Sequence, residues 1–88
     1  MSTHFLKDLQ KLVDKNPAIE SICSMDEPEM KNWFDTESPR FRNAFVINFT
    51  SGEKIVFNEK TYKDLGNGRV QINDICQWGA PSSYFFEV

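Results

Sequence analysis

The fold of this chain is decided by one stretch of alternating apolar side chains, Ala44-Phe45-Val46-Ile47-Asn48-Phe49-Thr50-Ser51-Gly52-Glu53-Lys54-Ile55-Val56-Phe57. The stretch predicts a β-hairpin with the three-residue loop Thr50-Ser51-Gly52, because glycine accepts the positive φ that the last loop position needs. In this register Phe45 faces Phe57, whereas a two-residue loop would put phenylalanine and isoleucine opposite lysine and asparagine. We expect the large side chains of one hairpin face to form the core: Phe45, Ile47, Phe49, Ile55 and Phe57.

Length and composition predict one small globular domain over residues 1–88. The chain is 40% hydrophobic and 26% charged, as is usual for globular proteins. A chain of 88 residues buries one modest core and leaves little interior for a deep catalytic pocket. Because it contains 8 Phe and 2 Trp, we expect some aromatic side chains to lie on the surface.

The formal net charge is −3, and the acidic residues gather in the first half of the chain. Residues 1–39 carry four lysines against eight Asp and Glu, whereas residues 40–88 carry six cationic residues against five acidic ones. This balance argues against the overall positive field that drives non-specific nucleic-acid binding, although it is compatible with a local basic patch.

The two cysteines, Cys23 and Cys76, are far apart in the sequence. We expect no secretory leader, and the sequence contains no apolar run of membrane-spanning length. We therefore expect a cytoplasmic protein with two buried or half-buried thiols rather than one disulfide, and no association with a membrane.

Two or three helices are predicted before the hairpin. Apolar side chains recur at three- and four-residue spacing from Phe5 to Val13, which is typical of an amphipathic helix. Pro17 ends this helix and can open a second short one, although a strand through residues 19–25 is the alternative. A third helix is predicted from Asp26, which would act as its N-cap with Glu29 three residues later.

The segment after the hairpin permits two interpretations. One is a short helix over residues 58–65, capped by Asn58 and closed by Gly66. The other is a second hairpin that pairs residues 60–65 with residues 69–74. We favour the helix, and expect an α+β fold with two or three N-terminal helices packed on one mainly antiparallel sheet of about four strands. The expected strands are residues 44–49, 53–57, 69–73 and 83–88.

The residues that usually carry catalysis or bind metal ions are scarce. There is one histidine, His4, and the two cysteines are isolated, so the sequence contains no zinc-binding pattern and no pairing of a nucleophile with a histidine base. Carboxylates such as Asp26 and Glu29 are better explained as helix caps than as acid–base catalysts. We expect a protein that is not an enzyme and that uses no cofactor and no metal ion.

With catalysis and metal binding disfavoured, we expect a small protein-interaction module whose partner is another protein. Large aromatic residues and arginines dominate binding hot spots. The candidate partner-binding residues are therefore Trp33, Phe34, Arg40, Phe41, Arg42, Trp78, Tyr84 and Phe85. An acidic patch that could occupy a basic groove of a larger protein or nucleoprotein enzyme comprises Asp26, Glu27, Glu29, Asp35 and Glu37.

Size, acidic balance and the lack of catalytic motifs are typical of the stand-alone regulatory or inhibitory proteins that bacteriophages and mobile elements encode. The alternative is a protein that binds single-stranded nucleic acid through a basic and aromatic sheet surface. The residues available for that surface are Arg40, Phe41, Arg42, Lys54, Lys60, Lys63 and Arg69.

Overall fold

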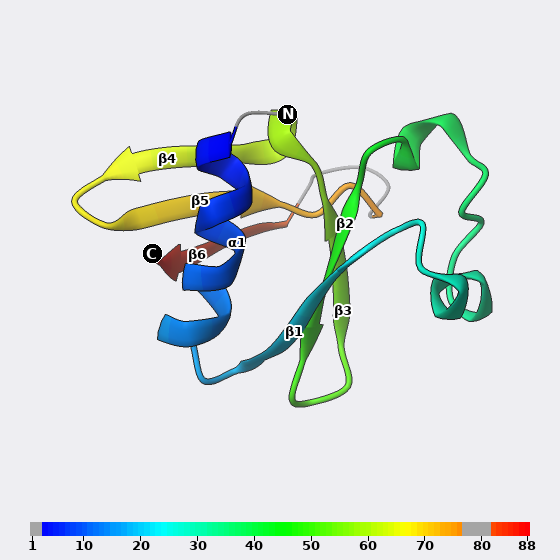
Figure 1. The fold of residues 1–88 in the computed structure, drawn as a ribbon, viewed down its shortest axis with the longest axis horizontal. Helices are drawn as coiled ribbons and strands as arrows, with labels where there is room; N and C mark the ends of the chain where they lie inside the picture. The colour runs from blue at the N-terminus through cyan, green and yellow to red at the C-terminus, as the bar shows by residue number, and fades with distance from the viewer. Residues whose placement is uncertain (1–2, 77–81) are drawn as a thin grey trace.

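A computed structural model describes residues 3–76 and 82–88 and contains, within them, one α-helix, six strands and three short 3₁₀ turns (Figure 1). In chain order the elements are α1 (Thr3–Lys15), β1 (Ile19–Ser24), η1 (Pro28–Asn32), η2 (Pro39–Phe41), β2 (Phe45–Phe49), β3 (Lys54–Phe57), η3 (Glu59–Thr61), β4 (Tyr62–Gly66), β5 (Arg69–Asn73) and β6 (Ser83–Glu87). The strands form two antiparallel sheets, the first in the order β1-β2-β3 and the second in the order β4-β5-β6. The expectation of two or three helices on one four-stranded sheet is therefore wrong.

The predicted hairpin is confirmed in its register. Phe45 pairs with Phe57 and Ile47 pairs with Ile55. The Phe49 N–H donates to the Glu53 carbonyl across the loop, at 2.9 Å. The loop ends at Gly52, whose φ of 94° lies in the region that glycine reaches without steric cost.

Both faces of this hairpin are buried, which explains why a second sheet is needed. One face packs against α1 and the inner face of the second sheet in a core that includes Leu12, Ile47, Phe57 and Ile72. The other face presents Val46 and Val56 to a second cluster of buried side chains, formed by Met25, Met30, Phe41 and Ala44. A strand that is apolar on both faces requires cover on both sides.

The predicted first helix is confirmed as α1, but the predicted second helix is wrong. Residues 19–24 form β1, which pairs with β2 and carries a bulge between Ile19 and Ser21. The alternative strand reading of this segment is the correct one. Because β2 lies in the middle of the first sheet, its backbone groups need a partner on both edges, and β1 provides the second partner.

The third predicted helix is also wrong, because only the 3₁₀ turn η1 forms in that segment. Glu27, not Asp26, occupies its N-cap position, and no side chain caps it. Met30 is the only buried residue of η1. One inward side chain gives a longer helix too little apolar contact to stabilise it, since helices in proteins depend mainly on the packing of one face.

The segment after the hairpin forms a second hairpin rather than the predicted helix. Asn58 does cap a helical turn, η3, but the chain leaves it at Tyr62 and enters β4. The tight turn into β5 consists of three consecutive residues with positive φ, Gly66, Asn67 and Gly68. The predicted strands at residues 69–73 and 83–88 are confirmed as β5 and β6, which pair with each other in the second sheet.

The single described α-helix, α1, packs against β1 and β6 and so covers parts of both sheets (Figure 1). At the end of α1, the Asn16 amide NH₂ donates to the Glu87 carbonyl at 2.8 Å, and the Asn16 Oδ1 accepts from the Glu87 N–H at 3.2 Å. Asn16 thereby satisfies both backbone groups of one residue on the edge of β6, as a further strand would. Over the described ranges, no helix combines the length and apolar character needed to cross a membrane.

Candidate functional site

The connection between β1 and β2 gathers most of the residues that the sequence singles out for binding. It spans residues 25–44 and leaves the body of the first sheet before returning to it (Figure 1). Its two ends meet where the Met25 N–H donates to the Ala44 carbonyl at 3.0 Å. Connections longer than roughly 12–15 residues are uncommon in compact proteins and often carry function.

The 25–44 connection is held in place by side chains of its own. Met25, Met30 and Phe41 are almost fully buried against the first sheet. The Phe34 ring, which is half-buried, meets the Phe41 ring edge-on with 5.9 Å between their centroids. These contacts make the connection a packed surface element, so its outward side chains have defined positions.

Trp33 is the largest of those outward side chains and is 63% exposed. The Lys54 ammonium lies over its ring, with Nζ 4.7 Å from the ring centroid. Lys54 is fixed in turn by donating to the Asn48 Oδ1 at 2.9 Å. Trp33 therefore lies above polar residues of β2 and β3 and keeps most of its indole in contact with solvent.

The three residues of the predicted Arg40-Phe41-Arg42 cluster differ in burial. Phe41 belongs to the core, whereas both arginines are exposed. The Arg40 guanidinium lies over the Phe41 ring at 5.3 Å and donates to the Ile75 carbonyl. Phe41 is thus a support for Arg40 and not a surface contact.

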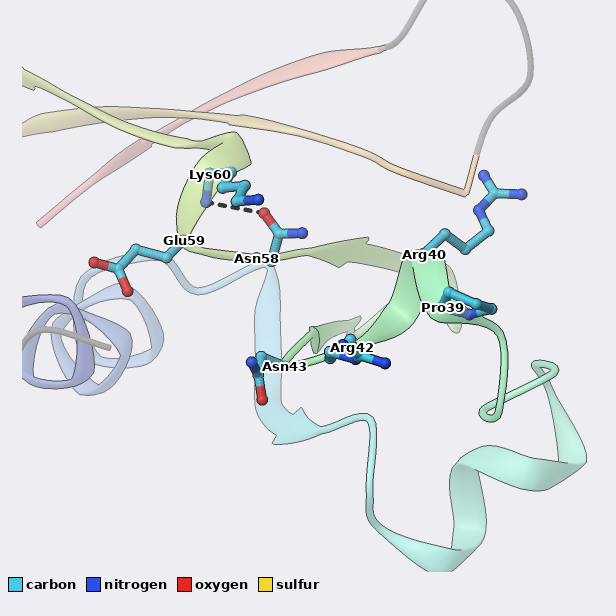
Figure 2. A pocket seen from close by; sticks show the side chains of 7 residues that line it. All are labelled: Pro39, Arg40, Arg42, Asn43, Asn58, Glu59 and Lys60. Carbon is cyan, nitrogen blue, oxygen red and sulfur yellow. Dashed lines mark hydrogen bonds between the residues drawn. The ribbon is translucent and has the colours of Figure 1, made fainter.

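The two arginines line an open pocket of about 790 Å³ (Figure 2). One wall consists of Pro39, Arg40, Arg42 and Asn43 from the 25–44 connection, and the other of Asn58, Glu59 and Lys60 at η3. Asn58 is held by a reciprocal capping interaction with Thr61. Sequence reasoning identified the Asn58 cap, but no local signal places Lys60 and Arg42 on the same pocket, because the fold brings together segments on either side of the hairpin.

The residues of the predicted acidic patch are all exposed on the 25–44 connection: Asp26, Glu27, Glu29, Asp35 and Glu37. Two of them, Asp26 and Glu37, line a smaller hollow of about 250 Å³ together with Arg42. The acidic and basic candidates therefore meet on one element. The sequence predicted them as separate groups.

The other aromatic candidates are not part of this surface. Tyr84 is half-buried in the core between the sheets, where it stacks on Phe86 with 6.4 Å between centroids. Phe85 lies on the opposite side of β6 and is 53% exposed. Trp78 lies outside the described residues.

Two carboxylates are buried and two thiols are half-buried in the structure. Asp8 and Asp74 are buried polar residues with hydrogen-bond partners. Cys23 and Cys76 are half-buried free cysteines, in agreement with the predicted unpaired thiols. Burial raises the pKa of the Cys76 thiol to about 11, with the Asp74 charge acting in the same direction and Arg40 opposing it.

Metal-binding side chains do not gather in the described part of the chain: nowhere in it do three His, Cys, Asp or Glu residues come together in a way that could hold an ion. Comparison with protein-family models, with curated proteins and with solved structures found no match.

Proposed function

We propose that this chain is a small non-catalytic module that binds another protein through the exposed side of its 25–44 connection. The observation that carries the proposal is the position of Trp33, which stays 63% exposed on an element whose other large side chains are anchored. A tryptophan held on a fixed backbone loses little conformational entropy when it enters a partner's pocket. Tryptophan is also the residue type most enriched in binding hot spots.

A protein partner fits the charge of this surface better than a nucleic acid does. The connection carries the five residues of the acidic patch and only three cationic residues, Lys31, Arg40 and Arg42. Phosphate backbones are repelled by such a balance, whereas mixed charges around an aromatic anchor are usual at the polar rim of a protein interface. We propose that the partner is a larger protein that this chain regulates or inhibits, in the manner of proteins that bacteriophages and mobile elements encode. The free cysteines suit a cytoplasmic setting.

A second candidate is single-stranded nucleic-acid binding on the outer face of the second sheet. There Lys63, Gln71 and Phe85 lie in register across β4, β5 and β6, and Phe85 is more than half exposed. A base could stack on Phe85 with its phosphate near Lys63. We rank this second, because the described residues of this face offer one exposed aromatic ring, Phe85, where sheet-binding domains use two or three.

The test compares two exposed aromatic residues on different surfaces. Immobilised wild type, Trp33→Ala and Phe85→Ala are each incubated with nuclease-treated and untreated lysate of the source organism or its host. We expect a protein that is retained in both lysates by wild type and Phe85→Ala and is lost with Trp33→Ala. Purified, that partner should bind Trp33→Ala about 30-fold more weakly, the usual effect of removing a hot-spot residue.

Two results would count against this assignment. Retention that disappears with nuclease and with Phe85→Ala would favour the second candidate. Equal retention by wild type and Trp33→Ala would exclude the 25–44 connection as the binding surface. Thermal melts of all three proteins serve as the control for folding, and we expect Trp33→Ala to lose only the weak cation–π contact with Lys54.

A further inference from the structure

The pocket beside Arg42 is a second site with its own chemistry, and we propose that it binds a phosphate monoester. This inference does not rest on the protein-binding role of Trp33. The pocket lies between the 25–44 connection and η3, and its size of about 790 Å³ falls in the range of small-molecule sites.

The pocket offers several hydrogen-bond donors to a ligand. Among the residues that the structure describes, neither the Arg42 guanidinium nor the Lys60 ammonium forms an ion pair or a side-chain hydrogen bond. The Asn58 Oδ1 already accepts from the backbone N–H groups of Lys60, at 2.9 Å, and Thr61, at 3.1 Å. The end of the Asn58 amide that is left for a ligand is therefore its donating NH₂ group.

The charge of the pocket differs in sign from that of the whole chain. Arg40, Arg42 and Lys60 stand against one acidic lining residue, Glu59, whose carboxylate points away from the two arginines (Figure 2). The chain as a whole has a formal net charge of −3. Three cationic groups lining one pocket in an acidic protein favour a ligand with more than one negative charge.

A phosphate monoester fits this donor set better than a carboxylate does. It carries a charge of roughly −1.5 to −2 at neutral pH and three acceptor oxygens, whereas a carboxylate carries one charge and two oxygens. Arginine suits such groups because its planar fork can donate two parallel hydrogen bonds. Arg42 and Lys60 supply positive charge from opposite walls of the pocket, which suits a ligand with several acceptor oxygens.

Two members of the pocket are oriented before any ligand arrives. The Arg40 guanidinium is held over the buried Phe41 ring, 5.3 Å from its centroid, and against the Ile75 carbonyl. Asn58 is fixed by the capping interaction with Thr61. Orientation in the free protein lowers the entropy cost of binding. The open pocket admits either a free phosphorylated small molecule or the 5′-phosphate at the end of a nucleic-acid strand.

The proposal is tested by amide chemical-shift titration of ¹⁵N-labelled protein at constant ionic strength. The probes are inorganic phosphate, glutarate, thymidine 5′-monophosphate and an oligothymidylate with and without a 5′-phosphate. We expect saturable shifts with phosphate centred on residues 40–43 and 58–60, and weaker binding of glutarate. The three thymidine probes distinguish the sources, because a free monoester site prefers the mononucleotide and a strand-end site prefers the phosphorylated oligonucleotide.

Charge-removing variants make the test specific to this pocket. Arg42→Gln and Lys60→Gln should each weaken phosphate binding about tenfold, as expected for the loss of one charge-assisted hydrogen bond. The matched controls are Lys11→Gln and Arg69→Gln, which remove exposed cations outside the pocket and should change the affinity less than twofold. Trp33→Ala should also leave phosphate binding unchanged, whatever happens to protein binding.

Three outcomes would overturn the proposal. One is a set of shifts that chloride reproduces at the same ionic strength. Another is a loss of affinity in the control variants equal to that in Arg42→Gln. The third is glutarate binding as tight as phosphate binding, which would make the pocket a carboxylate site. The amide spectrum of each variant reports directly whether it is folded.

Discussion

The Asp74 carboxylate accepts a hydrogen bond from the backbone N–H of Val56, with 3.1 Å between Oδ1 and the nitrogen. One residue later, the Ile75 N–H donates to the Val56 carbonyl at 2.9 Å. The same Oδ1 accepts from the Cys76 N–H at 2.9 Å. The chain leaving β5 thus satisfies both backbone groups of Val56 on the outer edge of β3. The two sheets are joined there by side-chain and loop contacts and not by a ladder of strand pairs.

Removing the Asp74 carboxylate should destabilise the protein strongly. Asp74 is only 4% exposed and Val56 is fully buried, so Asp74→Ala leaves a buried N–H without its acceptor. We expect a loss of about 2–3 kcal/mol in the free energy of unfolding, measured by urea denaturation. Asp74→Asn keeps an acceptor oxygen and should lose less than Asp74→Ala. The exposed Asp35→Ala serves as control, and a similar loss in all three variants would contradict the role given to Asp74.

The free energy of unfolding should fall at high pH because of the Tyr62 hydroxyl. Its hydroxyl donates to the buried Asp8 Oδ2 at 2.7 Å. Burial raises the pKa of Tyr62 well above its usual value, and the hydrogen bond to Asp8 and the charges of Asp8 and Asp64 act in the same direction. The unfolded chain loses this proton near pH 10, whereas the folded protein retains it, so stability is lost as the pH rises above about 10.

Tyr62→Phe isolates this effect, because the ring keeps its edge-on contact with Phe5, at 5.0 Å between centroids. At pH 7 the variant should lose about 1.5–3 kcal/mol of unfolding free energy, the usual value of a hydrogen bond to a charged group. Between pH 9.5 and 11.5 (roughly the range around the tyrosine pKa) its stability should fall less steeply than that of wild type. Parallel pH profiles of the two proteins in urea denaturation would refute the assignment.

Local patterns in the sequence were enough to predict the hairpin. Alternation from Phe45 to Phe49 and the position of Gly52 fix its register without any tertiary information. The same holds for α1 and for the Asn58 cap. The pairing of Val46 with Val56 follows from the same register, but the burial of this second face was not predicted.

The wrong predictions concern segments whose structure depends on tertiary contacts. Ile19, Ile22 and Cys23 fit a helix or a strand equally by spacing, and the free edge of β2 decides for the strand. The spacing of apolar residues predicts that β5 is a strand, but it does not indicate which sheet the strand joins. Burial of Asp8 and Asp74 contradicts the usual exposure of carboxylates, and only their hydrogen-bond partners explain it. The pocket that we propose to bind phosphate is lined by Arg42 and Lys60, which lie on either side of the hairpin in the sequence, so no single stretch of sequence contains it.

The Cys76 thiol should react slowly in the folded protein. Its pKa is raised to about 11 from an ordinary value of 9.0, chiefly by burial. Thiolate is the reactive form, so at pH 8 alkylation by iodoacetamide should be roughly a hundredfold slower in the folded state than in urea. A Cys23→Ser background makes Cys76 the only thiol observed, with mass spectrometry as the readout. Equal rates in both states would show that Cys76 is not protected.

Substitutions of Gly52 test whether its positive φ is the only reason that the hairpin loop requires glycine. Its φ is 94°, and a Cβ built there would meet nothing within 4 Å, so a side chain at this position would suffer no clash with other residues. Gly52→Ala should therefore cost about 1–2 kcal/mol of unfolding free energy through the positive φ alone. Gly52→Asn should cost less, because asparagine tolerates this region better. Both are measured by urea denaturation, with Ser51→Ala as control. A smaller loss for alanine than for asparagine would mean that something other than φ requires glycine.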